Sequence, residues 1–369
     1  MVASISARGN TKAALAYYAH LRQDDYYTRD GEPPGRWVGR GAERLSLQGP
    51  VTQSEFCAAL QGLDPKTGAP LVQRGGKAHA HAAGWDITFS APKSVSVLWA
   101  LSVPQERTAI EAAQRSAVTE ATRYLEKEAA WSRRGKGGLI REQAAGLLTA
   151  QFDHHTSRDL DPQLHTHCFV FNLAPRKDGT WGAIVSRELY KAQKEAGAVY
   201  RNTLANELER LGHQVERKAD SLRIGAIPKQ VERVFSKRRN AIQDAAQTHG
   251  YTTAKGMELA TLRTRKAKQN VRLESLFDAW RTEAKAHQFE LHQAHRKPKE
   301  ELFRSLIQAR SPSAPNPTSY ALNTLSAFRD NAMQVGQAFS RTLNTLKQPS
   351  KMTGLRPKLH PKSGECERE

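Results

Sequence analysis

DHHTSRDLDPQLHTH, residues Asp153–His167, is the most informative segment of this 369-residue chain. His165 and His167 lie two positions apart in a run of strand-forming side chains, so a strand would place both imidazoles on one face. His154 lies 11 residues before His165, across a polar loop that contains Asp-Pro. A chain reversal in that loop would return His154 on the neighbouring strand, beside the pair. The segment therefore predicts two strands that carry three imidazoles on one face.

These imidazoles are candidate ligands for a divalent transition metal. Three of them would leave coordination positions open, which is typical of catalytic rather than structural metal sites. His155 is an alternative third ligand, but in a strand it points opposite to His154, so only one of the two should serve. Cys168 directly follows His167 and should face away from the pair, as a small buried core residue. The competing interpretation is that these histidines only pack.

The first 220 residues are expected to mix helices and strands, which indicates an α+β fold. Patterns typical of strands cover Gly84–Ser90 (GWDITFS), Ser94–Ala100 (SVSVLWA) and Leu164–Leu173 (LHTHCFVFNL). Patterns typical of helices cover Glu106–Ala130 and Ala192–Leu211. The histidine pair thus falls on the last of these predicted strands.

The charge balance points to a polyanionic partner. Lys and Arg number 56 against 37 Asp and Glu, which gives a net charge of +19. Cations that neutralise phosphates release condensed counterions, so nucleic acid is the simplest partner and an acidic membrane surface is the other. No apolar run approaches the length of a membrane span and no signal segment is evident, which argues against a spanning or secreted protein. Three cysteines without CxxC spacing suit a reducing compartment, so we expect a cytoplasmic protein.

The composition changes after about residue 222. Residues 223–310 contain 19 Lys or Arg and 9 Asp or Glu on mostly helical patterns. We therefore expect a core over residues 1–222 and a basic helical region over 223–310 that grips DNA. Residues 311–319 (SPSAPNPTS) form a Pro-rich linker, 320–346 an amphipathic helix of unassigned role, and 347–369 a disordered tail.

Four of the nine tyrosines occur as two pairs, Tyr17-Tyr18 and Tyr26-Tyr27. Packing on a helix surface is the ordinary explanation for such pairs. A tyrosine oxygen is also a competent nucleophile once its proton is removed or its anion is stabilised. A neighbouring divalent metal can polarise a phosphate oxygen for such an attack. The pairs are therefore candidate nucleophiles for chemistry at a phosphodiester.

Taken in order, the two tyrosine pairs, the run GWDITFSAPKSVSVLW and the segment HHTSRDLDPQLHTH resemble the relaxase domain of MobF conjugative relaxases, which are HUH single-strand endonucleases. The resemblance extends from the N-terminus to roughly residue 300. It implies a hand-like fold, in which a central antiparallel sheet with flanking helices forms the palm and a helical region closes over single-stranded DNA. It also implies that the protein nicks and rejoins DNA at a plasmid origin of transfer through a 5′-phosphotyrosine bond.

The resemblance assigns roles to individual residues. Tyr17 matches the first nicking tyrosine and Tyr26 the second, with Tyr18 and Tyr27 as their neighbours. Asp86 matches an acidic residue that orients a ligand histidine and helps to take the tyrosine proton. The three metal ligands correspond to His154, His165 and His167. The metal could be Mg, Mn, Zn or Ni.

Four basic residues are candidate DNA contacts: Arg74, Lys77, Lys93 and Arg158. Members of this family commonly carry a helicase after the relaxase domain, but the chain has no GxxxxGK[ST] loop, so we expect no ATP binding. Expected partners are accessory relaxosome proteins, a coupling protein and a separate helicase. The alternatives are a rolling-circle replication initiator, which usually places its tyrosine after the histidines, and a non-enzymatic DNA-binding accessory protein or repressor.

Overall fold

The computed structural model describes residues 3–9, 14, 34–72, 82–266 and 271–291. All of them belong to a compact unit, Met1–Leu302. Both tyrosine pairs, Arg74, Lys77, the linker and the 320–346 helix lie outside the described residues. Among the described helices, none is long and apolar enough to cross a bilayer.

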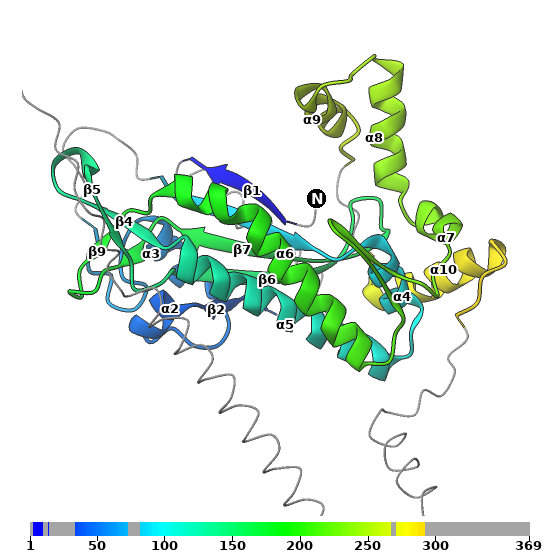
Figure 1. Cartoon of the computed structure of the whole chain (residues 1–369), viewed down its shortest axis with the longest axis horizontal. Helices are drawn as coiled ribbons and strands as arrows, with labels where there is room; N and C mark the ends of the chain where they lie inside the picture. The colour runs from blue at the N-terminus through cyan, green and yellow to red at the C-terminus, as the bar shows by residue number, and fades with distance from the viewer. Residues whose placement is uncertain (1–2, 10–13, 15–33, 73–81, 267–270, 292–369) are drawn as a thin grey trace, which may run out of the picture. The chain divides into compact units, whose positions relative to one another are not determined.

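A five-stranded sheet forms the centre of the unit (Figure 1). Each neighbouring pair of strands is antiparallel. In spatial order the strands are β1 (Ala3–Arg8), β3 (Gly84–Ser90), β7 (Pro162–Phe171), β6 (Thr149–Thr156) and β2 (Arg36–Val38). The expected α+β class with a central antiparallel sheet is confirmed. The strand predicted over Gly84–Ser90 is correct in both bounds, and the one predicted over Leu164–Leu173 is displaced by two residues at each end.

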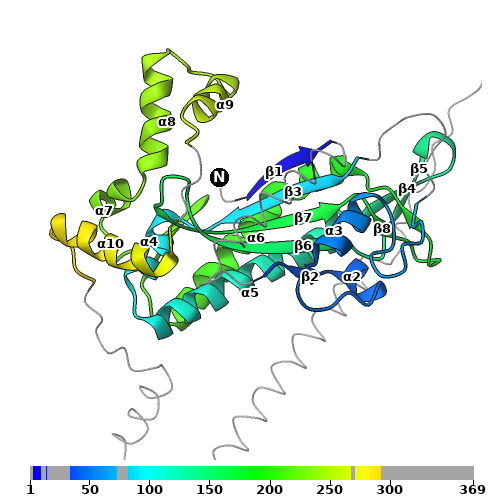
Figure 2. The ribbon, with the colours of Figure 1, turned by 180° about the vertical axis from the view of Figure 1, so that it is seen from behind.

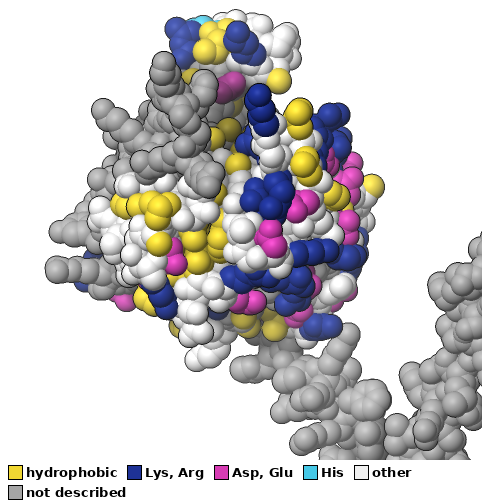
Figure 3. Space-filling model, turned by 90° about the vertical axis from the view of Figure 1, so that its left-hand side faces the viewer, with side chains coloured by type: hydrophobic (Ala, Val, Ile, Leu, Met, Phe, Trp, Pro, Cys, Tyr) yellow, Lys and Arg dark blue, Asp and Glu magenta, His cyan; other side chains and the backbone are white. Residues whose placement is uncertain are grey.

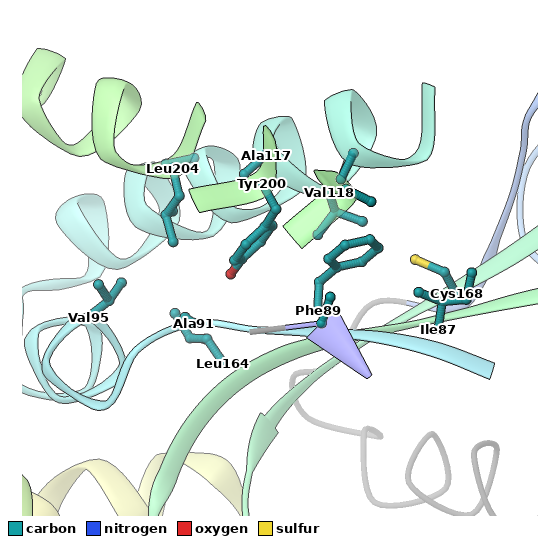
Figure 4. Packing of buried hydrophobic residues seen from close by; sticks show 14 of the residues in the cluster. Ile87, Phe89, Ala91, Val95, Ala117, Val118, Leu164, Cys168, Tyr200 and Leu204 are labelled. Atoms are coloured by element: carbon teal, nitrogen blue, oxygen red, sulfur yellow. The ribbon is translucent and has the colours of Figure 1, made fainter. Parts of the chain in front are cut away.

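Two 25-residue helices, α5 (Pro104–Glu128) and α6 (Ser186–Arg210), cover one face of the sheet. Figure 4 shows Ile87, Phe89 and Cys168 directed from the sheet toward these helices. Phe89 stacks on Tyr200 of α6, with ring centroids 5.4 Å apart. Cys168 is 1% exposed, which confirms the expected small core residue, and burial raises the pKa of its thiol.

The opposite face carries a smaller aromatic core beneath α3 (Gln53–Leu60). Phe56 of α3 contacts Phe152 of β6 and Phe169 of β7, with ring centroids 6.0 and 5.1 Å away. A capping box starts α3: the Thr52 hydroxyl accepts from the main-chain N–H of Glu55, whose carboxylate accepts from that of Thr52. The cap fixes α3 where Phe56 can fill the space over β6 and β7.

The strand predicted over Ser94–Ala100 is wrong, because these residues form helix α4 (Lys93–Leu101). Every residue of α4 after Lys93 is buried. A helix that is buried all round lacks the polar stripe that produces 3.6-residue periodicity, so the alternation of Ser and Val imitated a strand.

The two serines of α4 connect it to its neighbours. Ser96 Oγ accepts a hydrogen bond of 3.0 Å from the main-chain N–H of Leu164, on β7. Ser94 Oγ accepts one of 3.0 Å from Ile224, at the end of β11 (Ser221–Ile224). These bonds satisfy buried polar groups and hold α4 against the end of the sheet.

Short elements complete the unit. Near one end of the sheet lie α2 (Arg40–Arg44), the hairpin of β4 (Trp131–Arg134) and β5 (Ile140–Gln143) with the 3₁₀ turn η2 (Lys136–Gly138), and the pair β8 (Ala174–Pro175) and β9 (Trp181–Gly182). Strand β10 (Val215–Lys218) pairs with β11. The boundary expected at residue 222 falls inside β11, and it stays a prediction.

Beyond β11, the described part of the basic region is largely helical, and the extent expected for the region stays a prediction. It contains α7 (Lys229–Val234), α8 (Lys237–Thr248), α9 (Ala254–Arg263) and α10 (Leu273–Ala286). Figures 1 and 2 show α8 and α9 projecting from the body as an arm, whereas α10 lies against α4. Figure 3 shows that basic side chains on one face of the unit are interspersed with acidic and apolar ones.

The two-helix layer provides a test of stability. Leu204 of α6 is fully buried, so Leu204→Ala should lower the free energy of unfolding by about 2–5 kcal/mol. Leu139, at the tip of the β4–β5 hairpin, is 85% exposed, so the same substitution there should change it by less than about 0.5 kcal/mol. Urea denaturation measures both values, and similar losses would contradict the described packing of α6.

Candidate metal and nucleic-acid site

The register of β6 and β7 gathers the three histidines. His154 pairs directly with His165 across the antiparallel ladder, and His167 follows two residues along on the same face. The ring centroid of His154 lies 5.3 Å from that of His165 and 5.3 Å from that of His167, and the latter two are 5.1 Å apart. The imidazoles therefore form a nearly equilateral triangle, as the hairpin expected from the sequence requires.

The triangle has the dimensions of a three-nitrogen metal site. At a metal–nitrogen distance of about 2.1 Å, a ring centroid lies roughly 3.2 Å from the ion, and near-tetrahedral angles then separate centroids by about 5 Å. As the side chains are oriented in the described ranges, no three His, Cys, Asp or Glu groups could hold a metal ion together. The imidazoles thus fit a metal in identity and spacing, and ligation requires the rings to turn toward one point.

Hydrogen bonds determine which nitrogen of two rings is available. His165 Nδ1 lies 2.8 Å from the carbonyl oxygen of Gln163, which can only accept, so Nδ1 carries the proton. His167 Nδ1 lies 3.0 and 3.1 Å from the two carboxylate oxygens of Asp86 and is likewise the protonated nitrogen. In both rings the lone pair is consequently on Nε2, the position from which a metal would be bound.

Asp86 lies on β3 beside this triangle and is 3% exposed. The Arg8 guanidinium lies 3.4 Å from Asp86 Oδ2, and the Thr88 hydroxyl donates to the same oxygen over 3.4 Å. Thr88 Oγ1 is also 3.0 Å from His167 Nδ1. The carboxylate is therefore held against the Nδ1 side of the His167 ring, and the orienting role expected for Asp86 stays a prediction.

His155 faces the other way. Its ring stacks on Trp99 of α4, with centroids 4.9 Å apart and planes inclined by 10°, and its Nε2 lies 3.5 Å from Glu111 Oε1. Burial acts to raise the pKa of Glu111, but His155 and the Trp99 indole N–H outweigh it and lower that pKa. Of the two candidates for third ligand, the structure thus places His154 with the pair and His155 in the helix-side core.

The two described candidate DNA contacts are engaged within the protein. Lys93 Nζ donates to the carbonyl oxygen of Pro162 over 2.8 Å, and burial lowers its pKa from 10.5 to about 8, against the attraction of Asp161 and Glu232. Arg158 NH1 lies 3.5 Å from the carbonyl oxygen of Lys266. Burial is the main cause of the lowered pKa of Arg158. Neither position by itself indicates a phosphate contact.

Sequence reasoning did not identify Arg8, Thr88 or Gln163. Strand register places Arg8 and Thr88. Ser6 pairs with Asp86 across β1 and β3, which brings Arg8 near the same carboxylate. Thr88 pairs with His167 across β3 and β7. Thr88 had a usable signal, because it lies two positions from Asp86 in a predicted strand and so shares its face. Arg8 had none, because nothing in its surroundings shows which strand it joins.

Comparisons with known proteins agree on one family. A family model described as TrwC relaxase matches residues 11–287. The multifunctional conjugation protein TraI of Escherichia coli (strain K12) is 33% identical over 299 residues, which cover 78% of this chain and 16% of TraI. The chain thus spans only a small part of the length of the curated relatives that it matches.

Solved structures of the conjugative relaxase TrwC share the fold. A copper-bound complex with oriT DNA is 32% identical with a TM-score of 0.69, and a metal-bound complex is 31% identical with a TM-score of 0.69. A complex with a 27-mer DNA comprising the recognition hairpin and the cleavage site is 29% identical with a TM-score of 0.67. Each match covers 78% of this chain and 99% of the other.

Adjacent histidines on opposite faces give a matched test of the metal site. His154→Gln should weaken binding of Mn²⁺ or Ni²⁺ at least about 10-fold, because it removes one of three nitrogens. His155→Gln should leave metal affinity unchanged, because that ring packs on Trp99. Isothermal titration calorimetry measures both, and equal losses in the two variants would exclude the assignment of His154.

Lys93 provides a test of pH dependence. Between pH 8 and 10.5 the unfolded chain binds the Lys93 proton and the folded chain does not, so this group makes the protein more stable as the pH rises. Lys93→Met removes that contribution, so wild type should gain stability relative to the variant across this window. Urea midpoints at several pH values measure the difference, with exposed Lys191→Met as the control. A constant difference between wild type and Lys93→Met would show that the ammonium is not buried.

Proposed function

The chain belongs to the TrwC relaxase family, and we propose that it nicks and rejoins one DNA strand at a plasmid origin of transfer, which initiates conjugative transfer. The observation that carries this proposal is the triangle of His154, His165 and His167 with Asp86 behind His167. Three imidazoles and one buried carboxylate suit a metal site with open positions, as phosphodiester chemistry requires.

A divalent metal is the cofactor that this ligand set suits. His154, His165 and His167 would hold it, and it would supply a positive charge that polarises the non-bridging oxygens of the scissile phosphate. TrwC has been solved in metal-bound and copper-bound forms. Imidazole ligands favour later transition metals by affinity, and cellular supply decides among Mg, Mn, Zn and Ni.

Tyr17 is the proposed nucleophile for the first cleavage. Ala14, three residues before it, is helical, fully buried and part of the aromatic core that includes Phe152 and Phe169. Phe152 and Phe169 lie on the same sheet face as the histidines, two residues from His154 and His167. Three residues extend at most about 11 Å, and this short separation from Ala14 supports Tyr17 as the nucleophile.

The reaction exchanges one phosphate ester for another. The Tyr17 oxygen attacks the phosphorus, a tyrosine–phosphate bond forms at the 5′ end, and the bond to the 3′ oxygen breaks. Asp86 helps to take the phenol proton, and the departing 3′ oxygen gains a proton to become a hydroxyl. Because one ester replaces another, the strand can be rejoined by the reverse attack without ATP. Tyr26 would serve a second strand transfer, with Tyr18 and Tyr27 as neighbours of the two nucleophiles.

The positive charge of the chain supports single-stranded DNA as the ligand. Arg74, Lys77, Lys93 and Arg158 remain proposed contacts, of which Arg74 and Lys77 lie outside the described residues. The proposed setting is the cytoplasm, with accessory relaxosome proteins, a coupling protein and a separate helicase as partners and no use of ATP.

Covalent capture distinguishes this enzyme from a protein that only binds DNA. With metal and a single-stranded oligonucleotide of the parent plasmid's nick site, wild type should form a protein–DNA adduct that mass spectrometry maps to Tyr17. Tyr17→Phe should abolish the adduct and retain strand binding, because affinity comes from basic contacts. Consecutive side chains on a helix differ in direction by about 100°, so Tyr18 should not substitute fully.

Tyr26→Phe is the matched control, because it removes the same hydroxyl and should spare the first cleavage. An adduct on Tyr26 or Tyr27 in wild type would contradict the assignment of Tyr17. No adduct on any tyrosine would contradict the proposed reaction itself.

A further inference from the structure

The turn that joins the two histidine strands is unusually constrained. The main-chain N–H of Ser157 donates to the carbonyl of Asp161 over 2.9 Å, and the Ser157 hydroxyl accepts from the N–H groups of Asp159 and Asp161. Leu160 has a φ of +59°, a left-handed conformation that costs a leucine free energy. Such strain persists only where the surroundings hold it, so the contacts of this turn indicate what it does.

Asp159 is an acidic group buried among cations of the helical region. Its side chain is 3% exposed, with Lys266 Nζ 2.7 Å and Arg238 NH1 3.8 Å from its carboxylate. Arg238 also donates to the carbonyls of Thr261 and Thr264, at the C-terminal end of α9, over 3.2 Å each. Asp159 is therefore connected to both helices of the α8–α9 arm.

Asp161 faces the beginning of α8. Its side chain is 1% exposed and Lys237 Nζ is 3.8 Å away. Burial raises the pKa of Asp161, and Lys93, Lys237 and the main-chain N–H groups of Lys237 and Arg238 act against that rise. A carboxylate at the N-terminus of a 12-residue helix is favourably placed against the helix dipole.

A third contact comes from α10. The Trp280 indole N–H donates to the carbonyl of Leu160 over 2.8 Å, and Trp280 itself is 2% exposed. Three parts of the basic helical region thus contact four residues of one turn, Arg158–Asp161. The opposite ends of that turn continue into β6 and β7, which carry His154 and His165.

We propose that Asp159 and Asp161 are positioning residues, which lock the α8–α9 arm to the histidine hairpin so that a strand held by the arm is aligned with the metal site. This inference rests on the proposed nicking function. The rigid connection matters because in-line attack tolerates little displacement: about 1 Å of misplacement can lower the rate about 100-fold.

The negative charge of Asp159 allows an experiment to distinguish positioning from simple repulsion of DNA and from support of the fold. A carboxylate beside Lys266 and Arg238 opposes DNA phosphates, so its removal should strengthen strand binding. If the carboxylate only repelled DNA, its removal would favour both binding and cleavage. If it only supported the fold, its removal would weaken both. A positioning residue alone gives tighter binding together with slower cleavage of the bound strand.

The test compares Asp159→Asn with Asp278→Asn in the full chain. Asp278 is an 82% exposed residue of α10 that pairs with Arg281, so its substitution removes the same charge from the same region without touching the turn. Asp159→Asn should bind a nick-site oligonucleotide about twofold tighter and cleave it at least about tenfold more slowly in a single turnover. Asp278→Asn should cleave at the wild-type rate. Cleavage by Asp159→Asn at the wild-type rate, or weakened binding, would overturn the proposal.

Hydrogen–deuterium exchange tests the connection without DNA or activity. In Asp161→Asn, the amides of α8 and α9 should exchange about tenfold faster, because a carboxylate at the helix start is lost, while those of β3 and α5 stay as in wild type. Unchanged exchange in the α8–α9 arm, or faster exchange throughout the unit, would overturn the proposed connection between Asp161 and the arm. A wild-type chain that forms no adduct would instead overturn the proposed function, and this exchange result would be unaffected.

The exchanged pair Asp159→Lys with Lys266→Asp gives a further check. It restores opposite charges at the two paired positions in reversed order and should recover cleavage relative to either single variant. Additive losses would show that Asp159 does not act through Lys266.

Discussion

The site depends on the register of one antiparallel ladder, in which His154 lies directly opposite His165. Side chains alternate between faces, so a slip of one residue would move every histidine of a strand to the other side of the sheet. The neighbours that share the histidine face, Phe152 and Phe169, are buried against Phe56 of α3. Apolar packing therefore fixes the register, and the metal-ligand geometry follows from it.

The helix-side face of the same two strands carries a buried ion pair. Asp153 pairs with Arg36 over 2.6 Å and accepts from Thr166 over 2.7 Å. Burial acts to raise the pKa of Asp153, but Arg36 and Thr166 outweigh it and lower that pKa. The contacts of Asp153 on one face and of Asp86 with His167 on the other stiffen β6 and β7. A rigid platform suits chemistry in which the phosphate and nucleophile must be aligned closely.

The excess of positive charge has to be interpreted residue by residue. The basic helical region was expected to grip DNA, yet Lys237, Arg238 and Lys266 face the carboxylates of Asp159 and Asp161. Charge counting identifies a partner of opposite sign for the chain as a whole. It does not separate cations that meet phosphates from cations that hold the protein together, because both kinds have the same composition.

The sequence alone determined the α+β class, the hairpin with three histidines on one face, the inward direction of Cys168 and the family. These follow from local rules, because alternation in a strand depends only on position along the chain. The tertiary structure decided that α4 is a helix, since complete burial removes the polar stripe by which helices are recognised. It also decided the surroundings of Asp86, whose partner Arg8 comes from a strand 78 residues away, and the burial of Lys93. Contacts between distant segments arise from how strands order themselves in the sheet, and no local pattern encodes that order.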